Sequence, residues 1–491
     1  MPELSRQRRL LVLAICCLSL FIVGLDSTVV NVALPSIGRQ LHSPVSGLQW
    51  VIDAYTLVLA SLLMFSGSTA DRIGRRKTFQ VGLALFTLGS LLCSLAPGLG
   101  WLVAFRMLQA VGGSMLNPVA MSIITNTFTD AAERARAIGV WGGVFGLSMA
   151  LGPVAGGALV DSVGWRGIFW VNIPVGIAAI VLTALFVPES RAGRHRRPDP
   201  VGQILVIALL ASLTYGIIEG PGAGWGSPEI LAFFAVALVA LALFLPYERR
   251  RRDPLIDPRF FRSAPFSGAT AAAVSAFAAL GGFLFLNTLY LQEVRGLSPM
   301  QAGLYLLPMA ATLAVCAPLS GRIVASRGAR FPMMAAGIAL IAGGILLTTL
   351  ADASSTGFLV LSYIVFGAGL GLVNAPITNA AVSGMPRQQA GVAAAVASTS
   401  RQVGTALGVA VMGSVLNGNL HGPMRTGFVQ ASKPGWWIVA ACGAAVLGIG
   451  IATTGQWARR TAARTAALLE PAAGQFPGGG AKSPAEEANM R

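Results

Sequence analysis

Charged residues are scarce in this chain. Only 11% of its 491 residues are charged, while 54% are hydrophobic, whereas a soluble protein of this size carries roughly a quarter charged residues. This scarcity excludes an ordinary soluble domain and predicts a membrane protein with several spanning segments. The net charge of +16 does not indicate a nucleic-acid partner, because basic residues that interrupt apolar runs set membrane topology instead.

The sequence also lacks the residue groups that several enzyme and cofactor classes need. Histidine occurs only three times, at scattered positions, so no metal site is expected. The five cysteines all fall inside apolar runs and predict packing residues without a disulfide framework. A phosphate-binding loop needs a glycine before its Lys-Ser/Thr pair, and neither Lys77 nor Lys482 follows one. We therefore expect no use of ATP, no enzyme and no bound cofactor.

Apolar runs of about twenty residues, the length that crosses a bilayer as a helix, make up most of the chain. We place fourteen such spans, and an even number puts both termini on one side of the membrane. The pattern predicts an all-α polytopic membrane protein whose main partner is the lipid bilayer. The predicted spans are 10 to 32, 48 to 66, 78 to 97, 101 to 123, 137 to 160, 167 to 188, 201 to 219, 229 to 247, 266 to 291, 302 to 321, 331 to 350, 357 to 380, 392 to 416 and 435 to 455.

Arginine and lysine are distributed unevenly between the two sides of these spans. Segments on the side of the termini hold 26 of the 35 basic residues, whereas the opposite loops hold only Arg39, Arg166, Arg295, Arg425 and Lys433. Because basic loops stay in the cytoplasm, both termini are predicted to be cytoplasmic. The first run imitates a signal peptide, but it has no clear cleavage site, and we expect an uncleaved first helix.

A short charged loop between the second and third spans has the spacing of a hinge. Gly67 and Gly74 would let one helix end and the next begin after a sharp turn. Asp71 and Arg72 are placed to cap or bridge the two helix ends. The basic residues that follow would face lipid head groups: Arg75, Arg76 and Lys77. A loop that only fixes topology is the alternative, but it explains neither Asp71 nor the glycine spacing.

This loop resembles the loop between helices 2 and 3 of the major facilitator superfamily of secondary transporters. The resemblance implies that the loop latches the two halves of the protein together in one conformation, and that Asp71 and Arg72 take part in gating. The glycine spacing recurs from Gly321 to Gly328, with Ala325 where the acid would stand, so a second latch should be weaker.

The repeat divides the chain into parts. Two six-helix bundles, residues 1–190 and 263–458, are predicted to flank two extra spans with basic linkers, residues 191–262. The last part, residues 459–491, is rich in small and polar residues and is expected to be a disordered cytoplasmic tail. The expected architecture is a major facilitator fold with fourteen helices arranged as six, two and six.

One acidic and one basic residue lie inside spans of the first half. A carboxylate in a span costs at least ~2.5 kcal/mol and requires a partner, water or a proton. At about 1.5 Å per residue, Asp26 lies roughly 24 Å into a core of about 30 Å, and Arg106 enters from the other side to a similar depth. We expect the two to face each other. Protonation of Asp26 would release Arg106 and make the pair a proton switch; the alternative is a permanent ion pair that orients helices.

The sequence around these residues narrows the resemblance. The segment from Leu25 to Pro35, which includes Asn31, resembles the first-helix motif of drug:proton antiporters with fourteen spans, and the segment from Arg106 to Gly113 resembles their fourth-helix motif. The fifth span carries glycines and a proline similar to the motif that marks antiporters: Gly152, Pro153, Gly156 and Gly157. Proline kinks a helix and glycines four apart allow close helix contact, so simple helix packing would explain the glycines alone.

Several other polar residues lie within or at the ends of spans. They are candidates for lining a substrate cavity, although single polar residues in spans more often form hydrogen bonds between helices. Arg401 stands near the middle of its span with no acid at its depth. Its partner is backbone carbonyls, water or a substrate anion. The cavity candidates are Asn31, Asp53, Tyr55, Asn287, Tyr290, Asn374, Arg401 and Gln402.

The resemblance implies a proton-coupled antiporter that exports hydrophobic, amphipathic or cationic drugs across the cytoplasmic membrane. The proton would be the coupling ion. Three alternatives remain open at this point: a dedicated exporter of one metabolite or self-made antibiotic, a proton-coupled importer, and a membrane enzyme or receptor without transport.

Overall fold

The computed structural model describes residues 5–469 apart from 192–198, 252–253, 384 and 386–389, and every regular element in these residues is helical. Helices are the expected form of long apolar runs, because a helix satisfies its own backbone hydrogen bonds in lipid. Residues 192–198 and 252–253 of the predicted linkers lie outside the described residues.

The first half of the chain forms seven helices. The sixth predicted span, 167 to 188, is interrupted at Val171 and appears as a short helix followed by a longer one. The helices are α1 (Arg6–Leu41), α2 (Val45–Ile73), α3 (Arg75–Ser94), α4 (Leu99–Thr127), α5 (Ala131–Val163), α6 (Gly167–Trp170) and α7 (Asn172–Phe186).

The rest of the chain continues with the same kind of element. The extra pair is α8 (Pro200–Ala223) and α9 (Pro228–Arg250), followed by the 3₁₀ turn η1 (Pro258–Arg262). The second half comprises α10 (Ala264–Leu289), the π-helical turn η2 (Tyr290–Val294), α11 (Pro299–Tyr305), α12 (Leu307–Arg327), α13 (Arg330–Thr348), α14 (Thr356–Val382), α15 (Ala390–Asn419), α16 (Met424–Thr453) and α17 (Gln456–Leu469).

Among the described residues, thirteen helical segments are long and apolar enough to cross a membrane. They match all the predicted spans except the thirteenth. At that place α15 forms a helix of 30 residues, but it is not among the thirteen apolar segments. The total of fourteen spans stays a prediction.

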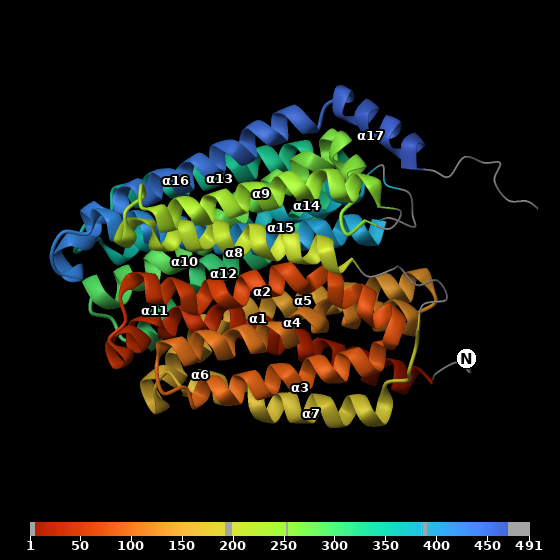
Figure 1. Cartoon of the computed structure of the whole chain (residues 1–491), viewed down its shortest axis with the longest axis horizontal. Coiled ribbons are helices and arrows are strands. Elements are labelled where there is room, and N and C mark those ends of the chain that lie inside the picture. The colour runs from red at the N-terminus through yellow and green to blue at the C-terminus, as the bar shows by residue number, and fades with distance from the viewer. Residues whose placement is uncertain (1–4, 192–198, 252–253, 384, 386–389, 470–491) are drawn as a thin grey trace, which may run out of the picture.

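Both halves pair their helices in the same way, as the sequence repeat predicts. In the first half α1 packs on α5, and α4 packs on α2 and α3. In the second half α10 packs on α15, and α14 packs on α12 and α13. Figure 1 shows the two halves as layers, with the red to yellow helices below the green to blue ones.

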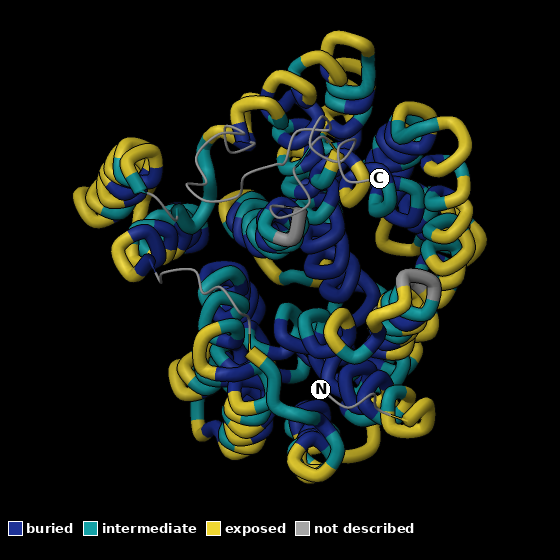
Figure 2. The backbone as a smooth tube through the Cα atoms, turned by 90° about the vertical axis from the view of Figure 1, so that its right-hand side faces the viewer, coloured by how far each residue is buried: buried dark blue, intermediate teal, exposed yellow. Residues whose placement is uncertain are grey.

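The extra pair lies along the junction between the halves. Helix α8 packs against both α2 and α15 (Figure 1). Its Gln203 side chain donates a hydrogen bond to the Ser61 carbonyl at 2.6 Å, and Trp50 of α2 donates to Glu219 at 2.8 Å. Figure 2 shows that buried residues concentrate toward the interior of the molecule. Helices α8 and α9 carry many exposed residues.

The chain has two faces where the helices end. We call the face that carries the start of α1 and the end of α16 the terminal face, and the other the opposite face. The end of the chain does not continue directly from α16 into a tail. Residues 459–469, which the sequence placed in a disordered tail, belong to α17, which packs on α10 and η1; residues 470–491 lie outside the described part.

Side-chain hydrogen bonds between the two halves gather at the opposite face. Gln49 of α2 donates to the Ala410 carbonyl at 2.8 Å, and Gln292 donates to the Val32 carbonyl at 2.8 Å. An exposed ion pair joins Arg39 to Glu293 at 2.7 Å. Within the described residues, no such bond links the halves at the terminal face. The halves are therefore held together at the opposite face.

A glycine contact reinforces this closure. A Cβ atom on Gly303 of α11 would lie 2.2 Å from the Pro153 carbonyl oxygen, and one on Gly157 of α5 would lie 2.5 Å from the Pro299 carbonyl oxygen. The backbones of α5 and α11 therefore touch at a distance that only glycine permits. Asp161 of α5 also accepts hydrogen bonds from Ser298 and from the backbone of Met300.

Replacing Gly303 by valine should open the opposite face. The added side chain collides with the Pro153 carbonyl, so α11 must move away from α5. We expect a cysteine placed at Val409, which is 1% exposed in the α2–α15 contact, to react several-fold faster with a membrane-impermeant maleimide. The background chain has its natural cysteines replaced by serine.

Gly357→Val is the matched control, because a Cβ atom at Gly357 has no neighbour within 4 Å. Equal labelling rates in the Gly303→Val and Gly357→Val chains would show that the α5–α11 contact does not hold this face closed.

Candidate functional site

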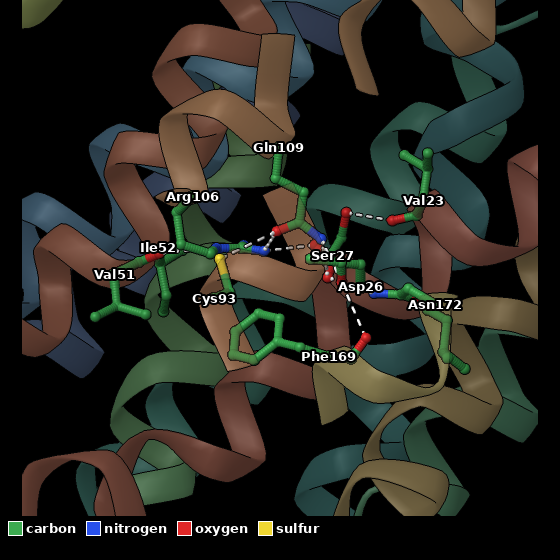
Figure 3. Close-up of polar contacts among 12 residues, drawn as sticks. Val23, Asp26, Ser27, Val51, Ile52, Cys93, Arg106, Gln109, Phe169 and Asn172 are labelled. Carbon is green, nitrogen blue, oxygen red and sulfur yellow. Dashed lines mark hydrogen bonds and ion pairs between the residues drawn. The ribbon is translucent and has the colours of Figure 1, made fainter. Parts of the chain in front are cut away.

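Asp26 and Arg106 form an ion pair inside the first half, as their depths predicted. An oxygen of Asp26 on α1 lies 2.5 Å from an Arg106 terminal nitrogen on α4, and the two side chains are 0% and 2% exposed. Figure 3 shows Arg106 reaching toward Asp26 past Gln109. The geometric part of the prediction is confirmed, while the role of the pair in proton coupling stays a prediction.

The carboxylate of Asp26 has two further partners besides Arg106. Its second oxygen accepts hydrogen bonds from Gln109 at 2.9 Å and from Asn172 at 3.1 Å (Figure 3). Ser90 of α3 accepts from Gln109 and Asn172 and donates to the Phe169 carbonyl. Three donors and complete burial make Asp26 the centre of a network that joins α1, α3, α4, α6 and α7.

Arg106 is satisfied in the same environment. Its Nε donates to the Val51 carbonyl at 3.3 Å, and a terminal nitrogen donates to Gln109 at 2.8 Å. The guanidinium carbon lies 4.0 Å from the centre of the Tyr55 ring, a favourable cation–π contact. The partners Ser90, Gln109 and Asn172 were not predicted from the sequence. Gln109 alone had a local signal, since it follows Arg106 by three residues and shares its helix face.

Asp53 is the second acidic side chain buried in the first half, and it differs from Asp26. It is 0% exposed, and neither of its carboxylate oxygens has a hydrogen-bond partner. It follows Gln49 by one helical turn on α2, and Gln49 bonds to α15. Asp53 therefore stands on the side of α2 that meets the second half, and not in an open cavity.

The other predicted cavity residues of the first half also have local roles. Asn31 is 5% exposed and donates to the Ser27 carbonyl one turn earlier. Tyr55 is 3% exposed beneath Arg106, and its hydroxyl has no hydrogen-bond partner. Neither residue faces open space in this conformation.

Two predicted residues of the second half are buried near the opposite face. Asn287 accepts a hydrogen bond from the Tyr363 hydroxyl, and its own amide nitrogen has no partner. Tyr290 is fully buried and donates to the Ala351 carbonyl at 2.7 Å. These contacts join α10 and η2 to α14 and to the segment before it.

Three predicted residues of the second half are partly exposed: Asn374, Arg401 and Gln402. Arg401 donates to the Thr378 hydroxyl at 2.6 Å, and its guanidinium carbon lies 5.8 Å from the centre of the Phe277 ring. Its Nε is buried without a partner. No acid pairs with Arg401, and its hydrogen-bond partner is a hydroxyl, which was not among the partners predicted from the sequence.

The predicted gating loop lies where α2 meets α3 at the terminal face, but it is shorter than expected: residues 67–73 belong to α2 and residues 75–77 to α3, so only Gly74 lies between the helices. Gly74 has a φ of +130° and ends α2, which an L side chain rarely tolerates. Asp71 accepts two hydrogen bonds from Arg75, at 2.8 and 3.2 Å, and bridges the helix ends as expected. Arg72 is exposed, and Gly67 packs against Pro118 with room for a Cβ atom.

The same loop is anchored to the end of the first half. Glu189 accepts from the backbone nitrogens of Arg76 and Lys77 at 3.1 and 3.3 Å, so a carboxylate satisfies the free donors at the start of α3. The Arg76 side chain donates to the Ala184 carbonyl at 2.8 Å. Among the described residues, the loop bonds only within its own half.

The glycine motif of α5 connects three helices. Cβ atoms on Gly152 and Gly156 would collide with Thr28 and Val29 of α1, while Gly157 touches α11. Pro153 lies between them and presents its carbonyl to Gly303. Glycines four apart do allow close contact with α1. The motif also places one glycine against the second half, which the sequence analysis did not anticipate.

Most of the chain matches one known protein family. The family model of the Major Facilitator Superfamily matches residues 16–409. The chain belongs to the major facilitator superfamily. Together with the apolar helices, this makes it a multi-pass protein of the cell membrane and a transporter by family.

Relatives within the superfamily carry names of resistance and export. The chain is 39% identical over 408 residues to the multidrug resistance protein Stp of Mycobacterium tuberculosis H37Rv, covering 83% of this chain and 76% of Stp. It is 37% identical to the tetracenomycin C resistance and export protein of Streptomyces glaucescens, covering 84% and 77% of the two chains. It is 34% identical to the multidrug efflux pump LfrA of Mycolicibacterium smegmatis, covering 82% and 80%.

Solved structures show the same fold at low identity. A bacterial homologue of the lysosomal transporter Spinster, in an inward-facing and unoccupied conformation, aligns with a TM-score of 0.63 at 18% identity, over 96% of this chain and 100% of that one. A bacterial homologue of the peptide transporters PepT1 and PepT2 aligns with a TM-score of 0.62 at 13% identity, over 94% and 100%.

Substitution of Asp26 and of Asp53, the two acids discussed in the first half, should change the stability of the protein differently. Asp26→Leu leaves Arg106 buried without its partner, which costs about 3–5 kcal/mol in folding free energy. Asp53→Asn removes no hydrogen bond and relieves the burial of an ionisable group, so stability should be kept or raised. Thermal unfolding of the purified protein in detergent at neutral pH measures both effects.

The double variant Asp26→Leu/Arg106→Leu is the control. It should recover most of the stability lost in Asp26→Leu, because replacing a whole buried ion pair by apolar groups is often neutral. Equal destabilisation by Asp53→Asn and Asp26→Leu would contradict the distinction between a paired and an unpaired carboxylate.

Proposed function

We propose that this protein is a proton-coupled antiporter that exports hydrophobic or amphipathic drugs and antibiotics across the cytoplasmic membrane by alternating access. The observation that carries the proposal is the distribution of contacts between the halves. The side-chain hydrogen bonds between the halves lie at the opposite face, and the gating loop at the terminal face bonds within its own half. A transporter that alternates between two accessible states needs one face closed while the other is free to open.

The direction of transport follows from charge and from the relatives. The basic residues on the side of the termini orient the terminal face to the cytoplasm, so this conformation would accept a substrate from inside the cell. The relatives are named for multidrug resistance, drug efflux and antibiotic export. The α5 glycine motif, which resembles that of antiporters, favours exchange over import.

The proton gradient is the proposed energy source. One proton crossing a potential of 100 mV provides about 2.3 kcal/mol, which sustains roughly a fiftyfold gradient of a neutral substrate. Asp26 is the first candidate for the proton, since its protonation would break the ion pair with Arg106 and loosen the network that joins five helices. Asp53 is the second candidate, because no donor bonds to its carboxylate and it lies on the side of α2 that would part from α15 when the opposite face opens.

A dedicated exporter of a single antibiotic is the second candidate function. The observation that favours it is the likeness to the tetracenomycin C resistance and export protein, which is named for one compound. A panel of substrates separates this possibility from broad drug export.

Cells that express the protein should exclude amphipathic dyes and antibiotics, and a protonophore should abolish the exclusion. Asp26→Asn should remove it as well, because the ion-pair switch is lost. Intracellular fluorescence at steady state, with and without the protonophore, measures the effect. Asp352→Asn, at an exposed position between α13 and α14, is the control and should behave as the wild type.

Asp53→Asn decides between the two carboxylates. If it abolishes exclusion while Asp26→Asn retains it, the coupling proton binds at Asp53. If wild-type cells exclude one antibiotic and no other member of the panel, the dedicated exporter is the correct reading. Exclusion that persists after the protonophore would contradict proton coupling.

A further inference from the structure

The second half of the chain contains very few acidic residues. Between residues 264 and 453 the sequence contains only two acidic residues, Glu293 and Asp352. Glu293 is paired with Arg39 at the opposite face, and Asp352 is exposed between two helices. Arg401 therefore has no counter-ion available within its own half.

Arg401 is also far from either membrane surface. It follows the start of α15 by eleven residues, which is roughly 17 Å along a helix and about the middle of the hydrocarbon core. An arginine at this depth costs at least ~2.5 kcal/mol and marks a functional position unless a partner compensates it. Its hydroxyl partner Thr378 and the Phe277 ring are neutral, and its Nε is buried with no partner at all.

The Arg401 side chain crosses the surface of α10 that faces the first half. Leu286 of α10 touches Gly435 of α16, and α16 lies on the side of the second half that is away from the first (Figure 1). Phe277 precedes Leu286 by nine residues, which places it on the opposite side of α10. Arg401 lies over this side, since it reaches from α15 past Phe277 to Thr378 on α14.

The surroundings of Arg401 are accessible although α10 is an interior helix. Phe277, Arg401 and Asn374 are partly exposed, and Thr378 is exposed. Because Phe277 faces the first half, this exposure opens toward the space between the halves, on the half of α14 and α15 nearer the terminal face. A substrate that enters from that face would meet an aromatic ring, two neutral polar side chains and a guanidinium without a counter-ion.

The first half does not neutralise this charge. Asp26 is enclosed in its network with Arg106, and Asp53 is buried and forms no ion pair with Arg401 in this conformation. Coulomb attraction between the guanidinium and a negative group in a partly desolvated site is strong, and a cation in the same place would be repelled.

We propose that Arg401 binds the negative group of an amphipathic substrate, and that the substrate's ring system lies against Phe277. This inference rests on the proposed export function and narrows its substrate class to aromatic or apolar monoanions, such as carboxylates, phenolates and sulfonates. It departs from the cationic substrates expected from the sequence.

Two fluorescent probes that differ by one group test the proposal: anilinonaphthalene sulfonate and the neutral phenylnaphthylamine, which lacks the sulfonate. Binding to the purified protein and uptake into energised inside-out vesicles are both measured. The wild type should prefer the sulfonate. Arg401→Gln should weaken sulfonate binding roughly tenfold to a hundredfold, the range of a lost charge-assisted hydrogen bond, and leave the neutral probe unchanged.

Three further variants separate charge from structure. Arg401→Lys keeps the charge and should retain part of the sulfonate preference, whereas Thr378→Val keeps the charge but removes the hydroxyl that positions it and should weaken the preference only partly. Arg460→Gln removes an exposed charge of α17 and should change nothing. Thermal unfolding of each variant confirms that it is folded.

The outcomes distinguish this inference from the proposed function. If the wild type exports the neutral probe but Arg401→Gln handles the sulfonate normally, the assignment of Arg401 is wrong and drug export stands. A wild type that prefers a cationic phenanthridinium dye to the sulfonate also overturns the assignment. If no probe binds or is exported by the wild type, the drug-export function fails together with the inference.

Discussion

A charged side chain inside a bilayer must be neutralised, hydrogen-bonded or given a ligand, and the architecture of this protein depends on how it meets that requirement. Asp26 and Arg106 neutralise each other, and the side-chain amides of Gln109 and Asn172 complete the hydrogen bonds of the carboxylate. The pair therefore fixes the relative positions of the helices of the first half. Asp53 is buried with neither carboxylate oxygen hydrogen-bonded. Arg401 bonds to a neutral hydroxyl, and its Nε is buried without an acceptor.

Close backbone contact is the second constraint, and glycine provides it. In the α5 motif, Gly152 and Gly156 bring α5 against α1, while Gly157 and Gly303 bring α5 against α11. One short sequence thus ties the helix that carries Asp26 to the closed opposite face. A change in the ion pair that shifts α1 would be felt at Gly152 and Gly156 and, through the same rigid helix, at the contact with the second half.

Much of this organisation was readable from the sequence because the bilayer limits the possibilities. Apolar run length gave the helix positions, the arginine distribution gave the predicted orientation, and depth along each span placed Asp26 opposite Arg106.

The predictions failed where position along the chain carries no information about which residues are neighbours. Asn172 donates to Asp26 from the start of α7, and Ser90 of α3 accepts from Asn172 and Gln109. Only the packing of several helices decides these contacts. The predicted cavity residues Asn31 and Tyr290 bond to backbone carbonyls instead, Asn31 one turn earlier in its own helix and Tyr290 at Ala351, far along the chain. Single polar side chains in spans often form such hydrogen bonds. The tail was misjudged at 459–469 because an amphipathic helix without strong apolar content resembles a polar linker until α10 and η1 cover one side.

The two halves share a fold but divide their polar groups unequally. The first half holds the buried Asp26 and Asp53 and the charged latch loop, whereas the second half has Arg401 inside a span without a counter-ion and Ala325 where the latch acid would stand. Such an asymmetry assigns different tasks to the halves in one transport cycle. In the cycle that we propose, protons interact with the half that contains the buried carboxylates, and the substrate's negative group interacts with Arg401 in the other half. Coupling between them then needs no direct contact of proton and substrate. It requires only that α5 and α2, which carry the close contacts and Asp53, change their packing on α11 and α15 when the charge state of the first half changes.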